Sequence, residues 1–346
     1  MKVLISSPLI PDFVGDGLMH GIRTLLGEDA IDIPRMHYMY KHCNPEMLKL
    51  TGNNGFTLYA KLGDSDRLNS LRANLSNSYD FFDLIIVIKP SCNVETLREL
   101  LFLKKANRLK AKVALIDGDD SSRLFPFTNF AHRFLHEFEL MFNRYKDFTL
   151  FKREFVGFSD LIGVTNSKLI GKFLSKVWNL ETISMSIPSE LVEHPSCNIK
   201  TKDFTEYIVD SDVTKETGKI FSAIREKRYL FHSEIDYYND IRSSRFGITT
   251  KRAGWDCLRH YEYAAKGAVL AFKNFETKAN TCAPFGLNSE NSISYHSYED
   301  LVAKINAINH SKYEQMQLKM YDWINTYTTD SVASRFLNKL NFSDGK

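Results

Sequence analysis

The sequence contains few cysteines, no long apolar run and almost no excess of charge of either sign. Its five cysteines lie far apart in 346 residues, and none has a CxxC or CxH spacing. An odd number of cysteines at such distances indicates free thiols in a reducing compartment and argues against structural zinc. No apolar run approaches the ~20 residues that a membrane-spanning helix needs. We therefore expect a soluble protein of the cytoplasm.

The balance of charge bears on the class of partner. Lysine and arginine number 45 against 42 aspartates and glutamates, so the formal net charge is +3. A dedicated nucleic-acid-binding protein usually has a stronger basic excess, which makes that class less favoured here. Hydrophobic residues make up 43% of the chain, as in ordinary globular proteins. The length suits about two domains of ~150 residues each.

Short aliphatic segments alternate with helical patterns along the chain. Runs such as LIIVI and VALI are apolar without alternation, which indicates strands covered on both faces, as in parallel sheets. The first residues, MKVLISSPLIPDF, fit a strand better than a signal peptide, because no small-residue cleavage site follows. The order of segments predicts a doubly wound α/β fold. Strands are expected at 3–7, 84–89, 113–117, 161–164, 206–209, 228–232, 246–249, 269–272 and 293–295, and crossover helices at 93–108 and 256–266.

An aromatic repeat spans residues 127–158. Its aromatic residues recur at intervals of three or four, which predicts one face of a helix or of two helices in series. We expect this face to lie in the core. The alternative is a surface that touches lipid or an aromatic acceptor, because Arg144, Lys146, Lys152 and Arg153 are interleaved with the rings. The repeat consists of Phe127, Phe130, Phe134, Phe138, Phe142, Tyr145, Phe148, Phe151, Phe155 and Phe158.

Segment 237–297 carries the strongest chemical signal. A strand at 246–249 leads into a loop with Lys251, Arg252 and Gly254, and a helix is expected to begin near Asp256, a favoured N-cap residue. The free N–H groups at a helix N-terminus suit a diphosphate. The two cations of the loop would add charge-assisted hydrogen bonds to its oxygens.

Two residues of the same helix complete this candidate site. Arg259 would also bind the diphosphate, and Glu262 lies three residues later on the same face. A carboxylate there can accept hydrogen bonds from both hydroxyls of a ribose, and we expect it to face a solvated cleft. The alternative is an ion pair between Arg259 and Glu262 on the helix surface.

The residues Arg259–Gly267, RHYEYAAKG, resemble the R-x-x-E-A-x-x-x-G pattern in the donor-binding half of GT-B glycosyltransferases. The longer string around them is similar to exostosin-like and family-1-like members from bacteria and viruses. Tyr263 departs from the usual alanine. The resemblance implies two Rossmann-like domains that face a cleft, a nucleotide-sugar donor and a hydroxyl acceptor. Synthesis of surface polysaccharide is the commonest role for such proteins.

The domain limits follow from this arrangement. Two prolines and several polar residues at 187–198 interrupt the periodicity and predict a boundary. We expect an acceptor-side domain at residues 1–190 and a nucleotide-sugar-binding domain at 191–325. A last helix at 326–346 would cross back onto the first domain. No metal or other cofactor is expected, because the loop and helix near 251–262 already supply positive charge.

Three residues of the first domain are candidates for catalysis. Asp16 and His20 follow the first strand, where a GT-B enzyme would place them against the acceptor or the transferred sugar. The alternative makes Asp16 a helix N-cap and His20 a packing residue. Asp117 ends a buried strand and is predicted to be the base that removes the acceptor's proton in an inverting transfer. Asp119 and Asp120 are its substitutes.

The segment 117–120, DGDD, leaves other functions open. It could hold a divalent metal, as in GT-A glycosyltransferases, or form an acidic turn. The elements before it also resemble the N-terminal half of phage DNA glucosyltransferases, for which nucleic acid is the acceptor. A non-catalytic nucleotide- or glycan-binding protein is a further alternative, and peripheral membrane contact is an expected partner. His132 and His136 lack a third ligand and are not predicted to bind metal.

Overall fold

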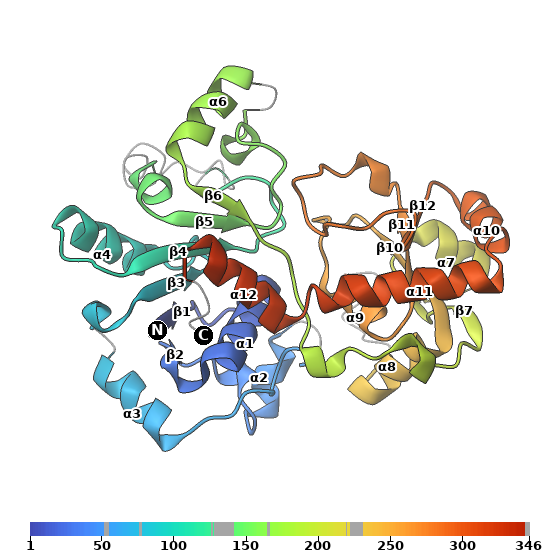
Figure 1. Ribbon diagram of the computed structural model, residues 1–346, viewed down its shortest axis with the longest axis horizontal. Coiled ribbons are helices and arrows are strands. Elements are labelled where there is room, and N and C mark those ends of the chain that lie inside the picture. Colours follow the sequence, from blue (N-terminus) through green and yellow to red (C-terminus); the bar gives the residue numbers. More distant parts are fainter. Residues whose placement is uncertain are drawn as a thin grey trace.

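The computed structural model describes residues 1–51, 55–75, 78–125, 127, 142–164, 167–218, 220–221 and 231–342. Within these residues the strands form a six-stranded sheet, a four-stranded sheet and a two-stranded pair. The two larger sheets stand apart, each with its own helices (Figure 1). The predicted fold, two Rossmann-like α/β domains, is confirmed, because one sheet running through both halves would have contradicted it.

The first sheet has the strand order β2-β1-β3-β4-β5-β6, and all its neighbouring strands are parallel. The aliphatic runs of β3 and β4 are buried, as their lack of alternation predicted. The strands are β1 (Val3–Ser6), β2 (Ala30–Asp32), β3 (Leu84–Ile88), β4 (Lys112–Asp117), β5 (Thr149–Lys152) and β6 (Leu180–Thr182). The helices that go with them are α1 (Phe13–Leu26), α2 (Pro45–Lys49), α3 (Asp66–Leu75), α4 (Val94–Lys105) and α6 (Lys168–Val177).

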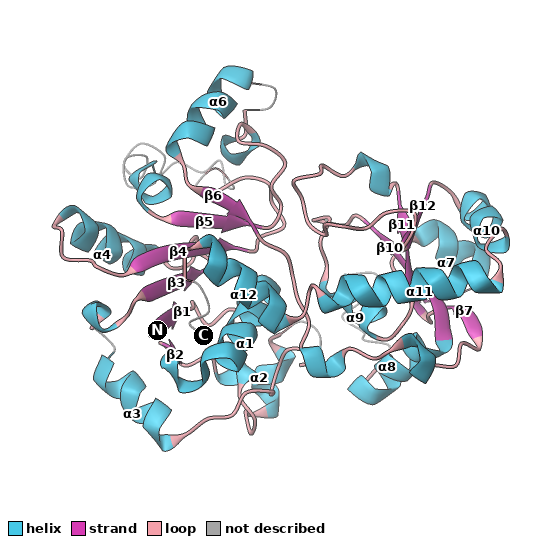
Figure 2. Cartoon of the chain, in the orientation of Figure 1, coloured by secondary structure: helices cyan, strands magenta, loops and turns pink. Residues whose placement is uncertain are grey.

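The second sheet has the order β12-β11-β10-β7, again parallel (Figure 2). Its strands are β7 (Lys202–Phe204), β10 (Ser244–Thr250), β11 (Val269–Lys273) and β12 (Ser292–Tyr295), with β8 (Tyr207–Ile208) and β9 (Ile220–Phe221) as the separate pair. The helices of this half of the chain are α7 (Ser211–Thr217), α8 (Glu234–Ser243), α9 (Leu258–Ala265), α10 (Tyr298–Asn306) and α11 (His310–Asn325), followed by α12 (Thr329–Lys339), which returns to the first sheet.

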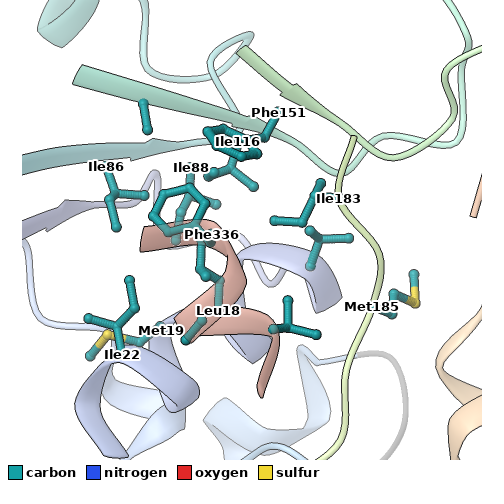
Figure 3. Packing of buried hydrophobic residues seen from close by; sticks show 14 of the residues in the cluster. Leu18, Met19, Ile22, Ile86, Ile88, Ile116, Phe151, Ile183, Met185 and Phe336 are labelled. Atoms are coloured by element: carbon teal, nitrogen blue, oxygen red, sulfur yellow. The ribbon is translucent and has the colours of Figure 1, made fainter. Parts of the chain in front are cut away.

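The chain passes between the domains twice, and the two passages are joined. The Ile187 N–H donates to the Tyr327 carbonyl over 3.1 Å, and the Thr329 N–H donates to the Ile187 carbonyl over 2.8 Å. Helix α12 then lies beside α1 on the first sheet (Figure 1). Phe336 of α12 packs on Phe151 of β5 with ring centroids 4.5 Å apart (Figure 3). The last helix of the chain therefore completes the core of the first domain.

The aromatic repeat is a helix only in part: residues 142–147 are helical and Tyr145, Phe148 and Phe151 lie in the core, as predicted, but the helix does not continue to Phe151. Phe151 lies in strand β5, where it pairs with β4 and β6, because sheet pairing outweighed the local helical period. A surface of lipid contact is also wrong for three of its four cations, because Arg144, Lys152 and Arg153 are buried and only Lys146 is exposed. Phe130, Phe134 and Phe138 lie outside the described residues, as do His132, His136 and residues 228–230 of an expected strand.

The strand expected at 161–164 is also wrong. The chain forms a single 3₁₀ turn at Asp160–Ile162 and then reverses at Gly163, whose φ is +75°. Glycine adopts this left-handed backbone conformation without steric penalty, so it ends the turn where a strand would have continued. Strands β2, β6 and β7 were missed, because three residues are too few to show a period.

The close approach of α1 and α12 makes one glycine essential. A Cβ at Gly21 would lie 1.9 Å from the Thr329 carbonyl oxygen, whereas a Cβ at Gly63 would meet nothing within 4 Å. We expect Gly21→Ala to lower the free energy of unfolding by about 1–3 kcal/mol, since the backbone of α12 must shift. Gly63→Ala, measured by the same urea titration, should change it little. Equal stability of the two variants would show that α12 does not pack as described.

Candidate functional site

A cavity of about 260 Å³ lies between the two domains at the start of α9. Four predicted site residues line it, namely Arg252, Gly254, Asp256 and Arg259, and the first domain contributes Asp120. The complete lining is Phe13, Asp120, Met185, Val209, Thr249, Thr250, Arg252, Ala253, Gly254, Asp256, Cys257, Leu258 and Arg259. The fold thus brings the predicted donor loop together with one carboxylate of the DGDD segment.

Arg259 projects from the first turn of α9 into this cavity. Its guanidinium carbon lies 5.0 Å from the centre of the Tyr207 ring. In the described part of the chain it forms no ion pair, so the alternative of a surface ion pair with Glu262 is wrong. A guanidinium that is held by an aromatic ring and has no carboxylate partner can bind an anion bidentately.

The sequence predicted that Glu262 faces a solvated cleft, and this prediction is wrong. Its side chain is buried, with the residue only 5% exposed, between the two domains. One carboxylate oxygen accepts a hydrogen bond of 2.6 Å from the Tyr237 hydroxyl, and the other accepts one from the Thr57 hydroxyl of the first domain. Burial raises the pKa of Glu262, and these two hydrogen bonds oppose the rise.

Thr57 is the partner that sequence reasoning missed. Its hydroxyl also lies 2.9 Å from the Tyr238 hydroxyl, and its N–H donates to Glu234 over 2.5 Å. Its φ is +72°, an uncommon backbone conformation for a β-branched residue. Such a conformation persists only where the surroundings hold it, and here the second domain supplies three of its contacts. Nothing in the local sequence, GFTLY, indicates this role.

Tyr263 explains how the chain departs from the GT-B signature. The tyrosine replaces the usual alanine and is buried against β10, where a Cβ at Gly247 would lie 2.2 Å from its ring. Its hydroxyl donates to the Tyr207 carbonyl over 3.2 Å. The larger side chain is therefore accommodated by a glycine on the neighbouring strand, and the helix keeps its place.

The position of Asp256 predicted that it would be the N-cap of α9, and this prediction is wrong. The helix begins at Leu258, and its N-cap residue is Cys257, whose side chain caps no N–H group. Asp256 instead accepts hydrogen bonds of 2.8 Å from the Met185 N–H and the Tyr261 hydroxyl. Burial raises its pKa to about 6, although the nearby Arg153 opposes this rise. Its carboxylate fixes the segment that links the domains.

The loop before α9 already holds a carboxylate of the protein. One oxygen of Glu154, just after β5, accepts hydrogen bonds from the N–H groups of Trp255 at 2.9 Å and Asp256 at 3.1 Å. A Cβ at Gly254 would lie 2.6 Å from that oxygen, so this position needs a glycine. These N–H groups are therefore not free for a diphosphate in this arrangement. The start of α9 itself, at Leu258 and Arg259, still lines the cavity.

The two cations of the loop differ in position. Lys251 and Arg252 are both exposed, but only Arg252 lines the cavity. The Lys251 ammonium lies 5.3 Å from the centre of the Trp255 ring. Arg252 is thus the better placed of the two to meet a ligand beside Arg259.

Asp117 does not reach the cavity. It is buried, and its carboxylate accepts hydrogen bonds from the Lys152 ammonium at 2.9 Å and the Asp119 N–H at 3.1 Å. Burial raises its pKa, and Lys152 opposes the rise. Asp120, which the sequence offered as a substitute, is exposed, lines the cavity and pairs with the side chain of Arg153.

Asp16 and His20 do not face the cleft, so their expected contact with acceptor or sugar is wrong. Asp16 is 0% exposed and accepts hydrogen bonds from the Tyr59 hydroxyl at 2.9 Å and the Asp12 N–H at 3.0 Å. The N-cap of α1 is Asp12. The His20 imidazole is buried, and its Nδ1 lies 2.9 Å from the Thr329 hydroxyl of α12. In this structure both side chains are buried and hydrogen-bonded within the first domain.

Among the described residues, no three His, Cys, Asp or Glu side chains are grouped closely enough to hold a metal ion. All five cysteines, which lie in that part of the chain, have free thiols, as their spacing predicted. No described helix combines the length and apolarity needed to cross a bilayer.

The burial of Glu262 changes the expected effect of replacing it. In Glu262→Gln the amide nitrogen cannot accept a hydrogen bond, so the hydroxyl of Thr57 or Tyr237 loses its acceptor. We expect the free energy of unfolding to fall by about 1–3 kcal/mol, as measured by urea denaturation. The exposed Glu290, replaced by Gln, should leave it unchanged. Wild-type stability of Glu262→Gln would mean that the carboxylate is solvated after all.

Comparison with known proteins gives the fold but no sequence relative. No family model and no curated protein sequence matches the chain. Three similar solved structures each align with 99% of the chain. HepE of Anabaena in complex with UDP has 10% identity, 100% of its own chain aligned and a TM-score of 0.51. The trehalose-6-phosphate synthase OtsA has 12% identity, 99% of its own chain aligned and a TM-score of 0.53, and a glycosyltransferase from Rickettsia africae has 11% identity, 99% of its own chain aligned and a TM-score of 0.50. The protein therefore has the GT-B fold that its sequence signature predicted.

Proposed function

We propose that the protein is a glycosyltransferase that moves a sugar from a nucleotide-sugar donor to a hydroxyl acceptor. The observation that carries this proposal is the interdomain cavity, whose lining includes both Arg259, at the start of α9, and the exposed Asp120 of the first domain. A cation for the donor's diphosphate and a base for the acceptor thus come from different domains. Proteins of the same fold support it, since HepE has been crystallised with UDP and glucose (8% identity, TM-score 0.53).

Each charged residue of the cavity would have its own role in the transfer. Arg259 and Arg252 bind the diphosphate, helped by the free N–H groups at the start of α9. Asp120 removes the proton of the acceptor hydroxyl, whose oxygen forms a bond with the anomeric carbon. The bond from that carbon to the donor phosphate breaks, and the diphosphate leaves with its electron pair. Arg153, paired with Asp120, positions this carboxylate.

Donor binding would rearrange the contact between the domains. The GT-B resemblance assigns Glu262 to the ribose of the donor, but Thr57 and Tyr237 now bind both of its carboxylate oxygens. A ribose can take the place of the Thr57 hydroxyl if residue 57 moves away with the first domain. We infer that the donor enters a more open arrangement of the two domains.

The proposal extends to the setting of the reaction. The acceptor is a glycan, in the synthesis of surface polysaccharide or a related polymer, as the resemblance implies. The free cysteines suit the cytoplasm, where disulfides rarely persist. Peripheral contact with a membrane belongs to the same proposal, although not through the aromatic repeat, which the sequence offered only as an alternative surface for lipid.

Donor affinity should depend on Arg259. Removing a charge-assisted hydrogen bond costs about 1.5–3 kcal/mol, so Arg259→Gln should weaken the binding of a nucleoside diphosphate about 10- to 100-fold. Calorimetry with UDP and a panel of other nucleoside diphosphates would measure this. Arg245, which pairs with Asp203 outside the cavity, provides the matched control as Arg245→Gln. Equal losses of affinity in both variants would contradict the assignment of Arg259. If the wild-type protein binds a nucleotide sugar but releases no nucleotide with any acceptor tested, the protein is a non-catalytic binding protein.

Turnover should not require a metal ion. Arg252 and Arg259 can balance the charge of the leaving diphosphate, so a chelator should leave the rate of nucleotide release unchanged. The rate would be measured with the donor found by calorimetry, before and after treatment with EDTA. If EDTA abolishes release, manganese restores it and Asp119→Asn removes the manganese effect, then segment 117–120 binds a metal and the GT-A alternative applies.

A further inference from the structure

Helix α6 of the first domain carries large apolar side chains on its outer surface. Leu169 is 83% exposed and Phe173 is 55% exposed. They lie four residues apart, so they share one face of the helix. The neighbouring face packs against the domain, where Leu174 is buried and Ile170 and Val177 contact the core. The apolar surface of α6 is therefore wider than the core of the domain can cover.

A row of lysines borders this exposed apolar strip. Lys168, Lys172 and Lys176 recur at every fourth residue. Lys168 directly precedes Leu169, Lys172 directly precedes Phe173, and Lys176 follows Phe173 by about one turn. All three are exposed, and α6 contains no aspartate or glutamate. Among the described residues no carboxylate forms an ion pair with them. The polar border of the strip is thus positive only.

The position of α6 relates the strip to the cavity. The helix follows β5 along the chain, so its first turn lies toward the carboxyl edge of the first sheet, from which Asp120 reaches the cavity. Two further exposed apolar residues, Val156 and Val164, lie in the segment between β5 and α6. In Figure 1, α6 projects beyond β6, the last strand of the sheet.

We propose that α6 docks the protein on an anionic lipid bilayer. Leu169 and Phe173 enter the boundary between head groups and acyl chains, while the three lysines contact lipid phosphates. This assignment rests on the proposed function in one respect: the membrane would hold the acceptor near the cavity. A second copy of the chain is a poorer occupant, because a two-fold interface through α6 would set its lysines against those of the partner.

The chemistry of the strip also sets the strength of the contact. Two large apolar side chains on a helix of ten residues bury little area, so the binding is reversible. The lysines act through the surface potential of the bilayer, which salt screens within about 10 Å at 0.1 M. Binding should therefore need anionic lipid and fall as salt rises.

Sedimentation of the full chain with vesicles tests the proposal. Wild-type protein should bind vesicles of phosphatidylcholine with phosphatidylglycerol, and neither vesicles of phosphatidylcholine alone nor the mixed vesicles in high salt. Leu169→Glu should reduce the partition coefficient about tenfold, and replacing Lys168, Lys172 and Lys176 by Gln should reduce it by about fivefold for each lysine. Ile235→Glu, at a 69% exposed position of α8, is the matched control and should bind as wild type.

Three results would overturn the proposal. The first is failure of the wild-type protein to bind mixed vesicles, and the second is equal binding by Leu169→Glu and Ile235→Glu. The third is a mass in light scattering that doubles as the protein concentration rises, while Leu169→Glu keeps the mass of the monomer. The last would identify a second copy as the occupant. Thermal melting checks that the variants are folded. The assay contains no donor, so failure of the proposed transfer reaction would not alter its outcome.

Discussion

A buried arginine and the glutamate beside it connect the two domains. Arg153 donates to the Gly118 carbonyl over 2.9 Å, pairs with Asp120 and donates to the backbone carbonyl of Asp256 in the second domain. Glu154 accepts the N–H groups of the same loop. Buried charges are tolerated only when such partners surround them. The position of the donor loop relative to the first domain therefore depends on this contact.

The same contact determines what the cavity can do. It brings Asp120 of the first domain to the cavity that Arg259 also lines, and it occupies the N–H groups of Trp255 and Asp256 with a protein carboxylate. The diphosphate of the proposed donor would then rely on the guanidinium groups and on the start of α9. The second contact between the domains, from Thr57 to Glu262, closes the side where a ribose would lie. Both contacts use charged or hydrogen-bonding groups, which the donor of the proposed reaction would replace.

The covalent crossings limit how far the domains can move. The passages at Ile187 and Thr329 are hydrogen-bonded to each other, and α12 is packed tightly on α1 through Gly21. Apolar packing holds α12 to the first domain, whereas polar contacts join the loop of the second domain to it. Movement is therefore expected to separate the polar contacts first, because water can replace hydrogen bonds but not apolar packing.

The sequence by itself determined the class of fold and pointed to the loop that lines the cavity. Continuous aliphatic runs predicted β3, β4 and β11 because burial on both faces leaves no alternation, and the pattern from Arg259 to Gly267 indicated GT-B. Only the tertiary structure decided which carboxylates face the cavity. Asp117 and Asp120 are three residues apart, but strand pairing buries the first beside Lys152 and leaves the second exposed.

The partners of the site residues were also beyond the reach of the sequence. Glu154 and Thr57 meet the second domain across 101 and 205 residues of chain, and no local period records such a contact. Asp256 has the residue type of an N-cap, but its carboxylate accepts a hydrogen bond from the N–H of Met185 in the linker. Local patterns report burial and helix or strand period, whereas the pairing of charges between domains is fixed only when the chain has folded.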